Sequence, residues 1–205
     1  MAKSLPVSVR LKRLRRAALP GDTAALARFL IGKYLVHDAP AGRMAGRIVE
    51  TEAYAPGDSS AHSFRGPTPR NRSLFLERGH AYVYFIYGNW YAVNVSGEKK
   101  GVGAGVLLRA CEPVEGLLLM RRNYRGAAAD LGRGPGRLAA AMDIDRRLDG
   151  VDLCGPGPLW LGSGGAPARG IGASSRIGLS RETHRLMRFY EKGSLFLSGP
   201  KRLNV

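Results

Sequence analysis

Two runs of aromatic and β-branched residues, joined by a two-residue turn, constrain the fold of this chain more than any other segment. Residues 81–87 (AYVYFIY) and 90–96 (WYAVNVS) flank the dipeptide Gly88-Asn89. A dipeptide of this kind between two strand-like runs is typical of a tight β-hairpin. The sequence therefore predicts a sheet in which neighbouring strands run antiparallel.

The rest of the chain alternates short helical and strand-like segments. A helix is expected over 24–31, with Asp22 or Thr23 as N-cap and Gly32 at its end, and two more over 113–122 and 135–142. Further strands are expected at 33–37, 47–54, 106–111, 188–191 and 194–198. Residues 55–72 form a loop too long for a simple connector.

The length of 205 residues and the 44% hydrophobic content suit one packed domain. No internal repeat or linker is evident. We expect an α+β fold at residues 21–205, with a curved, largely antiparallel sheet, a protruding hairpin and flanking helices. A basic arm at residues 1–20 precedes it, and the sequence leaves open whether that arm is ordered.

The charge balance favours a polyanionic partner. Lys and Arg outnumber Asp and Glu by 32 to 16, and residues 1–20 contain six of the basic residues and no acid. Dispersed basic residues neutralise phosphates along a duplex. A solvated surface kept soluble by like charge is the alternative, and the acid-free first segment is also compatible with an organelle transit peptide.

Cysteine and histidine spacing predicts neither a disulfide framework nor a metal site. Cys111 and Cys154 lie far apart without a CxxC motif, and the four histidines are scattered. The apolar runs are much shorter than the ~18 residues of a spanning helix. We expect a soluble protein of a reducing compartment that uses no metal or cofactor and binds no membrane.

The tip of the hairpin carries aromatic side chains that the protein core cannot all cover. Tyr87, Asn89 and Trp90 surround the turn, and a nucleic acid is a natural cover in a basic protein, since such side chains wedge into a duplex. The alternative is that one ring folds back onto the sheet.

The strand RIVETEAY places a carboxylate beside a possible aromatic wall. Alternation puts Glu50, Glu52 and Tyr54 on one face and Val49, Thr51 and Ala53 on the other. A carboxylate so placed can deprotonate a water and stabilise an oxocarbenium-like transition state at a sugar. Tyr82 and Tyr84 supply a second aromatic face. The plainer interpretation is that these glutamates are surface charge.

Other basic residues are candidates for anion contacts. Arg109 stands inside an apolar strand and needs an anion, which Glu112, Glu115, Glu52 or a DNA phosphate could supply. Phosphate-binding candidates are Arg70, Asn71 and Arg72 in the long loop, and Lys99 and Lys100 in a glycine-rich turn. Such clusters are also common on solvated surfaces.

Several motifs occur in one order along the chain: 46–54 (GRIVETEAY), 61–63 (AHS), 68–72 (TPRNR), 82–88 (YVYFIYG), Asn94 and 107–113 (LLRACEP). Together they resemble the alkyladenine (3-methyladenine) DNA glycosylase family of the mammalian type, over residues 24–199. The resemblance implies a monofunctional enzyme of base-excision repair. It would flip alkylated or deaminated purines, such as 3-methyladenine, 7-methylguanine and hypoxanthine, from duplex DNA and hydrolyse the N-glycosidic bond.

The resemblance also assigns roles by position. Glu52 matches the general base that activates water, and Arg109 and the backbone carbonyl of Ile177 match positions that hold this water. Asn94 matches a residue that screens normal guanine, and Tyr87 matches the intercalating side chain, whereas Asn89 and Trp90 depart from the family pattern beside it. The base-binding positions are Tyr54, His62 and Tyr84, with Tyr82 grouped beside them.

Further expectations follow from this assignment. No lysine stands beside Glu52, so no lyase step is expected. The partner would be duplex DNA containing damaged purines, bound by a monomer. The location would be the nucleoid-containing cytoplasm of a bacterium, or the nucleus or an organelle of a eukaryote. Two alternatives remain at this point: a non-catalytic nucleic-acid-binding module on the same scaffold, and a basic structural protein that binds anionic surfaces.

Overall fold

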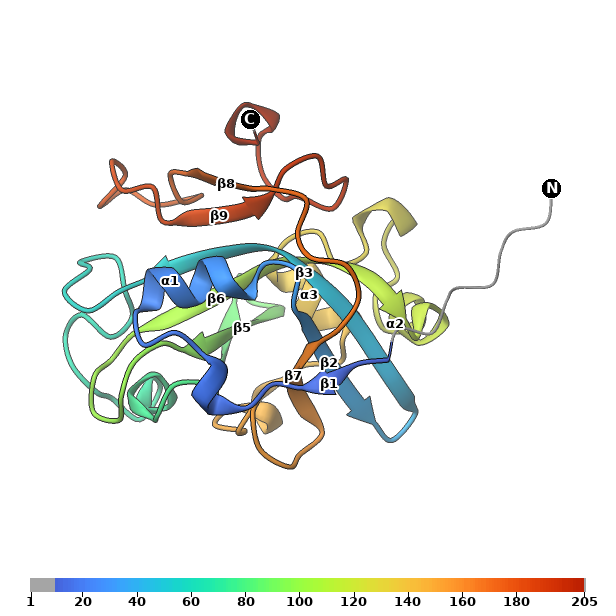
Figure 1. The fold of residues 1–205 in the computed structure, drawn as a ribbon, viewed down its shortest axis with the longest axis horizontal. Helices are drawn as coiled ribbons and strands as arrows, with labels where there is room; N and C mark the ends of the chain where they lie inside the picture. The colour runs from blue at the N-terminus through green and yellow to red at the C-terminus, as the bar shows by residue number, and fades with distance from the viewer. Residues whose placement is uncertain (1–9, 205) are drawn as a thin grey trace.

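One long strand, β3 (Gly42–Tyr54), organises the molecule because three other strands pair with it. The structure is a computed structural model and describes residues 10–204. Within them, a nine-stranded antiparallel sheet runs in the order β1-β7-β2-β3-β6-β5-β4, and β9 adds β8 at the other end of β3 (Figure 1). This is the expected α+β architecture.

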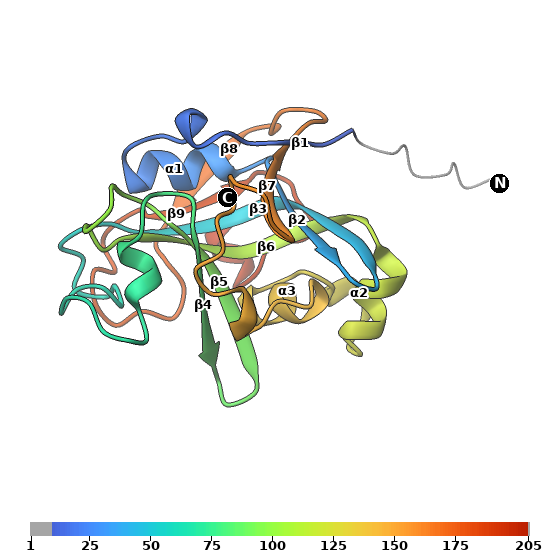
Figure 2. The same cartoon turned by 90° about the horizontal axis from the view of Figure 1, so that it is seen from below.

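The strands other than β3 are shorter. Their bounds are β1 Lys12–Arg13, β2 Tyr34–Ala39, β4 Ala81–Ile86, β5 Trp90–Ser96, β6 Gly105–Glu115, β7 Leu159–Ser163, β8 Ile171–Ser174 and β9 Arg188–Glu191. The strands β4 and β5 form the predicted hairpin, which extends beyond the body of the molecule (Figure 2).

Three α-helices cover the sheet: α1 (Thr23–Leu30), α2 (Leu117–Asn123) and α3 (Pro135–Ala141). The Asp22 carboxylate accepts from the Ala25 amide at 2.7 Å, which makes Asp22 the N-cap of α1. Buried Leu26 and Leu30 on α1 join the main core. Among residues 10–204, none of the helices is long and apolar enough to cross a membrane.

Three local predictions are wrong. The second helix begins at Leu117 and not at residue 113, because residues up to Glu115 continue β6 and pair with β3. Residues 194–198 form no strand, and the Ser198 amide donates to Glu50 instead. The hairpin turn has three residues, since Ile86 pairs with Trp90, and Tyr87 itself adopts a left-handed conformation (φ +51°).

Residues 1–9 of the expected arm at 1–20 lie outside the described residues. Residues 10–20 belong to the domain. Leu14 and Leu19 are buried in the main core, β1 pairs with β7, and Arg16 forms an ion pair with Asp152 at 2.6 Å. The packed domain therefore includes residues before position 21, because these apolar side chains bury against it.

Candidate active site

An irregularity in the pairing of β3 with β6 shapes the centre of the candidate site. Ile48 pairs with Cys111 and Glu50 with Ala110, but Thr51 pairs with Leu108, so Val49 and Arg109 have no paired residue opposite them. Bulges of this kind redirect side chains and are common beside active sites. Here the bulge also overturns one expectation: Val49 packs with Tyr190 and Leu197, in a different cluster from Ala53.

Glu52 is fully buried and lies against three groups from different parts of the chain. The Tyr54 hydroxyl donates to its Oε2 at 2.9 Å, and the Ile177 amide donates to its Oε1 at 2.7 Å. Arg109 Nη1 lies 3.3 Å from Oε2 as an ion pair. A carboxylate offers about four acceptor positions. Glu52 therefore retains room for one further donor, such as a water.

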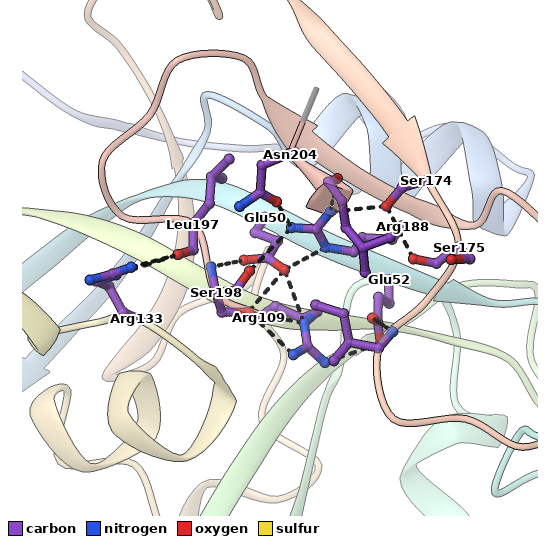
Figure 3. A network of polar contacts seen from close by, with 12 residues as sticks. Glu50, Glu52, Arg109, Arg133, Ser174, Ser175, Arg188, Leu197, Ser198 and Asn204 are labelled. Atoms are coloured by element: carbon purple, nitrogen blue, oxygen red, sulfur yellow. Dashed lines mark hydrogen bonds and ion pairs between the residues drawn. The ribbon is translucent and has the colours of Figure 1, made fainter. Parts of the chain in front are cut away.

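Glu50, two residues earlier on the same strand, has a different environment. Its carboxylate accepts from Arg109 Nε at 3.1 Å, Arg188 Nε at 2.7 Å, and the Ser198 amide and hydroxyl at 2.6 and 2.9 Å. Figure 3 shows Glu50 enclosed by these donors. Three of these donors contact Oε1 and one contacts Oε2, so the carboxylate of Glu50 is held by two guanidiniums and by Ser198.

A cavity of about 190 Å³ opens next to Glu52. Glu52 itself does not line it, but all three groups that contact the carboxylate belong to lining residues, so Glu52 lies directly behind the wall. The volume is below the roughly 300–1,000 Å³ of sites for drug-sized ligands and suits one flat ring system. Expected site residues that line the cavity are Tyr54, His62, Tyr82, Tyr84, Tyr87, Asn94, Arg109 and Ile177.

Aromatic rings form most of one wall. Tyr82 and Tyr84 stack with centroids 5.0 Å apart, and the His62 ring meets Tyr84 edge-on at 4.6 Å. Burial raises the pKa of Tyr84 to about 12, and burial followed by the charge of Arg70 lowers the pKa of His62. The wall therefore presents neutral rings at neutral pH. Asn94, also in the wall, donates to the Tyr82 carbonyl at 3.4 Å.

Tyr54 is held between the cavity and a buried arginine. Burial, and then the charge of Glu52, raise the pKa of Tyr54, so its hydroxyl stays protonated and donates to Glu52. The Arg176 guanidinium lies 4.6 Å from the Tyr54 ring centroid, while its Nη1 donates to the Ala53 carbonyl at 2.9 Å. Arg176 does not line the cavity, so it supports Tyr54 from behind.

Arg109 remains charged despite its burial. Burial opposes the charged form, but the carboxylates of Glu52 and Glu50 outweigh it and raise the pKa of Arg109. Of the four anions that the sequence offered as partners of Arg109, the structure pairs it with Glu52. It also pairs Arg109 with Glu50, which was not among the four. Glu112 lies opposite Arg47 in the pairing of β3 with β6.

The hairpin tip separates the three expected intercalating residues. Tyr87 is 88% exposed, and Asn89 is exposed beside it. Trp90 is only partly exposed, because its ring packs near Tyr124, with centroids 6.0 Å apart, and closely covers Gly136 on α3. Of the two alternatives left open for the tip, Trp90 follows the second in that its ring folds back onto the protein, although against α3, while Tyr87 remains exposed.

The expected phosphate-binding residues also divide. Arg70 and Arg72 are exposed, and Lys99 and Lys100 are exposed in the turn after β5, at the opposite end of that strand from the hairpin tip. Asn71 is 4% exposed. Its side-chain Oδ1 accepts a hydrogen bond from the Thr68 backbone amide, and its Nδ2 donates to the His62 and Gly66 carbonyls. Asn71 therefore holds the long loop together, since its polar atoms are used inside it.

A basic pocket adjoins the base-sized cavity and shares His62 and Tyr82 with it. It has a volume of about 280 Å³, and its charged lining consists of Arg65, Arg70 and Arg181. Sequence reasoning did not single out Arg181, and the scattered arginines of residues 151–205 offered no signal. It also assigned no role to Glu50, Arg176 or Arg188. The sequence offered one signal for Arg188, a charged residue at the start of the predicted strand RFYE.

Among residues 10–204, no group of three or more His, Cys, Asp or Glu side chains is arranged to hold a metal ion. The two cysteines are unpaired, and burial raises their pKa values to about 12 for Cys111 and about 11 for Cys154. Both thiols are therefore protonated at neutral pH.

Comparisons with known proteins identify the family of this chain. A profile of the Methylpurine-DNA glycosylase (MPG) family matches residues 17–195. A protein of Mesorhizobium japonicum with the printed name "Putative 3-methyladenine DNA glycosylase" is 60% identical over 93% of this chain and 92% of its own length. Relatives with the same printed name in Paraburkholderia phytofirmans and Rubrobacter xylanophilus are 55% and 44% identical, covering 94% and 85% of this chain and 91% and 92% of their own.

The comparisons therefore define a DNA repair protein of the glycosylase class, which acts on alkylated bases. Within that class, the chain belongs to the methylpurine-DNA glycosylase family.

Proposed function

We propose that this DNA glycosylase hydrolyses the bond between a flipped alkylated purine and its deoxyribose, using a water activated by Glu52. The observation that carries the proposal is the free acceptor position on a buried carboxylate directly behind a base-sized aromatic cavity. Glu50 is just as buried, but Arg188 and Ser198, which hold it, do not line the cavity, whereas all three partners of Glu52 do. This difference favours Glu52 as the carboxylate that takes the proton.

The chemistry balances without a cofactor. Water attacks C1′ of the sugar and loses a proton to Glu52, and the C1′–N9 bond breaks with its electron pair going to the base. N3- or N7-alkylated purines carry positive charge and leave as neutral molecules. The Glu52 carboxylate stabilises the oxocarbenium-like transition state, while Arg109 and the Ile177 carbonyl hold the water.

The cavity wall suits a cationic base. Stacking on Tyr54, Tyr84 and neutral His62 contributes about 0.5 to 2 kcal/mol of cation–π attraction. Asn94 would screen against normal guanine by means of the exocyclic amine that guanine carries. Deaminated purines such as hypoxanthine need a proton on the leaving base, and we include them in the proposed range with that requirement.

The exposed surface suits duplex DNA. Tyr87 would fill the gap left by the flipped nucleotide, with Asn89 beside it, while Arg70, Arg72, Lys99 and Lys100 contact phosphates. We propose that the protein acts as a monomer. We also propose that it is located with the chromosomal DNA, in the cytoplasmic nucleoid of a bacterium or in the nucleus or an organelle of a eukaryote.

We also propose that the reaction stops at an abasic site. Among residues 10–204, the ion-pair partner of Glu52 is Arg109 and no lysine is paired with it, which supports this proposal.

The test is base release from duplexes that carry a single 7-methylguanine, 3-methyladenine or hypoxanthine, with borohydride added to trap an imine. The expected result is free damaged base, an intact abasic strand and no trapped complex. Binding without release would instead favour a non-catalytic module, and a trapped complex would contradict the simple hydrolysis.

A further inference from the structure

Four buried charged side chains connect Glu52, the candidate general base, to strand β9. Glu52 and Glu50 lie on β3, Arg109 lies on β6 and Arg188 on β9, and Figure 3 shows them as one chain of contacts. The side chains of both glutamates and of Arg188 are 0% exposed, and that of Arg109 is 10% exposed. Two positive and two negative charges are therefore balanced inside the protein.

Arg109 is the link between the two carboxylates, and its planar guanidinium has a fixed orientation. Nε donates to Glu50 at 3.1 Å and Nη2 donates to the Ser198 hydroxyl at 3.2 Å. With these two directions fixed, Nη1 is the nitrogen that faces Glu52 at 3.3 Å. The bulge in β3 and β6 makes this possible, since it leaves Arg109 without a paired residue opposite it.

Arg188 in turn holds Glu50 in place. Its Nε donates to Glu50, while Nη1 donates to the Ser174 hydroxyl and the Leu203 carbonyl at 2.9 Å each. Its Nη2 donates to Asn204 Oδ1 at 2.6 Å. The last described residues of the chain thus close over Arg188 and complete the enclosure of Glu50.

We infer that Glu50 is a positioning residue of the glycosylase reaction, acting on Glu52 through the orientation of Arg109. This inference rests on the proposed role of Glu52. Glu50 does not line the cavity, and its carboxylate holds Arg109 so that Nη1 stays against Glu52. Arg188 and Ser198 keep that carboxylate in place from the other side.

The test compares Glu50→Gln with Glu191→Gln. Gln keeps the size of Glu50 but gives its neighbours an amide nitrogen at one of the two oxygen positions, where the Ser198 amide or a guanidinium also donates. Glu191 is the matched control: it is 4% exposed, pairs with Arg47 and lies on β9 next to β3, but contacts neither Arg109 nor Glu52. Both changes remove one buried carboxylate from an ion pair.

Two quantities are measured for each variant on one lesion-containing duplex: the single-turnover rate of base release and the dissociation constant. For Glu50→Gln, we expect the rate to fall about 10²-fold, as for a misplaced catalytic group, with the dissociation constant within about 3-fold of wild type. Glu191→Gln should keep the wild-type rate. Should Glu50→Gln fail to fold, Ser198→Ala keeps all four charges and should lose about 10-fold in rate alone.

The outcomes separate the two hypotheses. A wild-type chain that releases no base overturns the proposed function and this inference with it. An active wild type with a folded Glu50→Gln of normal rate overturns the inference alone. Equal rate losses in Glu50→Gln and Glu191→Gln also overturn it, since they reflect general damage to the sheet.

Discussion

The exposed ring at the hairpin tip gives a prediction with little interference from folding. Tyr87 is 88% exposed, so Tyr87→Ala should change the free energy of unfolding by less than about 0.5 kcal/mol. The φ of +51° is equally unfavourable for Tyr and Ala, so it cancels. Since Trp90 packs against the protein, Tyr87 is the aromatic ring at the tip that is free to stack.

Stacking of a base on an aromatic ring contributes about 1–3 kcal/mol. Tyr87→Ala should therefore weaken binding to a duplex with a flipped nucleotide about 5- to 150-fold. Fluorescence anisotropy with a duplex containing an abasic analogue, against the same undamaged duplex, measures this selectivity. Tyr87→Phe keeps the ring and serves as control. Equal losses on both duplexes would refute the wedge role.

Three further changes test other parts of the site. Asn94→Ser should increase release of normal guanine relative to 7-methylguanine, as measured on a mixed-duplex panel, because the screening amide is removed. Arg188→Met removes one of the two guanidiniums paired with Glu50 and leaves the four buried charges with one negative charge in excess, so it should cost about 3–5 kcal/mol in urea unfolding; wild-type stability would contradict the network. The pKa of His62 is lower in the folded chain than its usual value of 6.5 in the unfolded chain. The free energy of unfolding should therefore decrease as the pH is lowered below 6.5. His62→Gln should remove that part of the decline, and an unchanged pH dependence of the urea midpoint would argue against it.

Local signals in the sequence predict much of the fold. The N-cap and terminal glycine give α1 almost to the residue, and the aromatic runs give the β4–β5 hairpin. Long-range pairing is what local patterns miss. Residues 112–115 continue β6 because β3 lies beside them, which overrides the helix-start signal of Pro113.

The candidate site divides along the same line. Arg109 could be singled out from residue type, since a charge is unusual inside an apolar strand, whereas Glu52 and Tyr54 were assigned their roles by the resemblance to the glycosylase family. Their connections could not, because they depend on a bulge and on residues far away in the chain. Glu50 and Glu52 look alike in the motif ETE, and only their partners in the structure separate them. All three partners of Glu52 line the cavity, whereas Arg188 and Ser198, which hold Glu50, do not.

The central claim is that Glu52 activates the attacking water. The most direct test is the single-turnover release of 7-methylguanine by wild type and Glu52→Gln, each with its affinity for abasic DNA. Gln has the same size and can still accept from the Tyr54 hydroxyl, so binding should be nearly unchanged. We predict that release falls below detection, at least about 10²- to 10⁴-fold. Release at the wild-type rate would contradict the account.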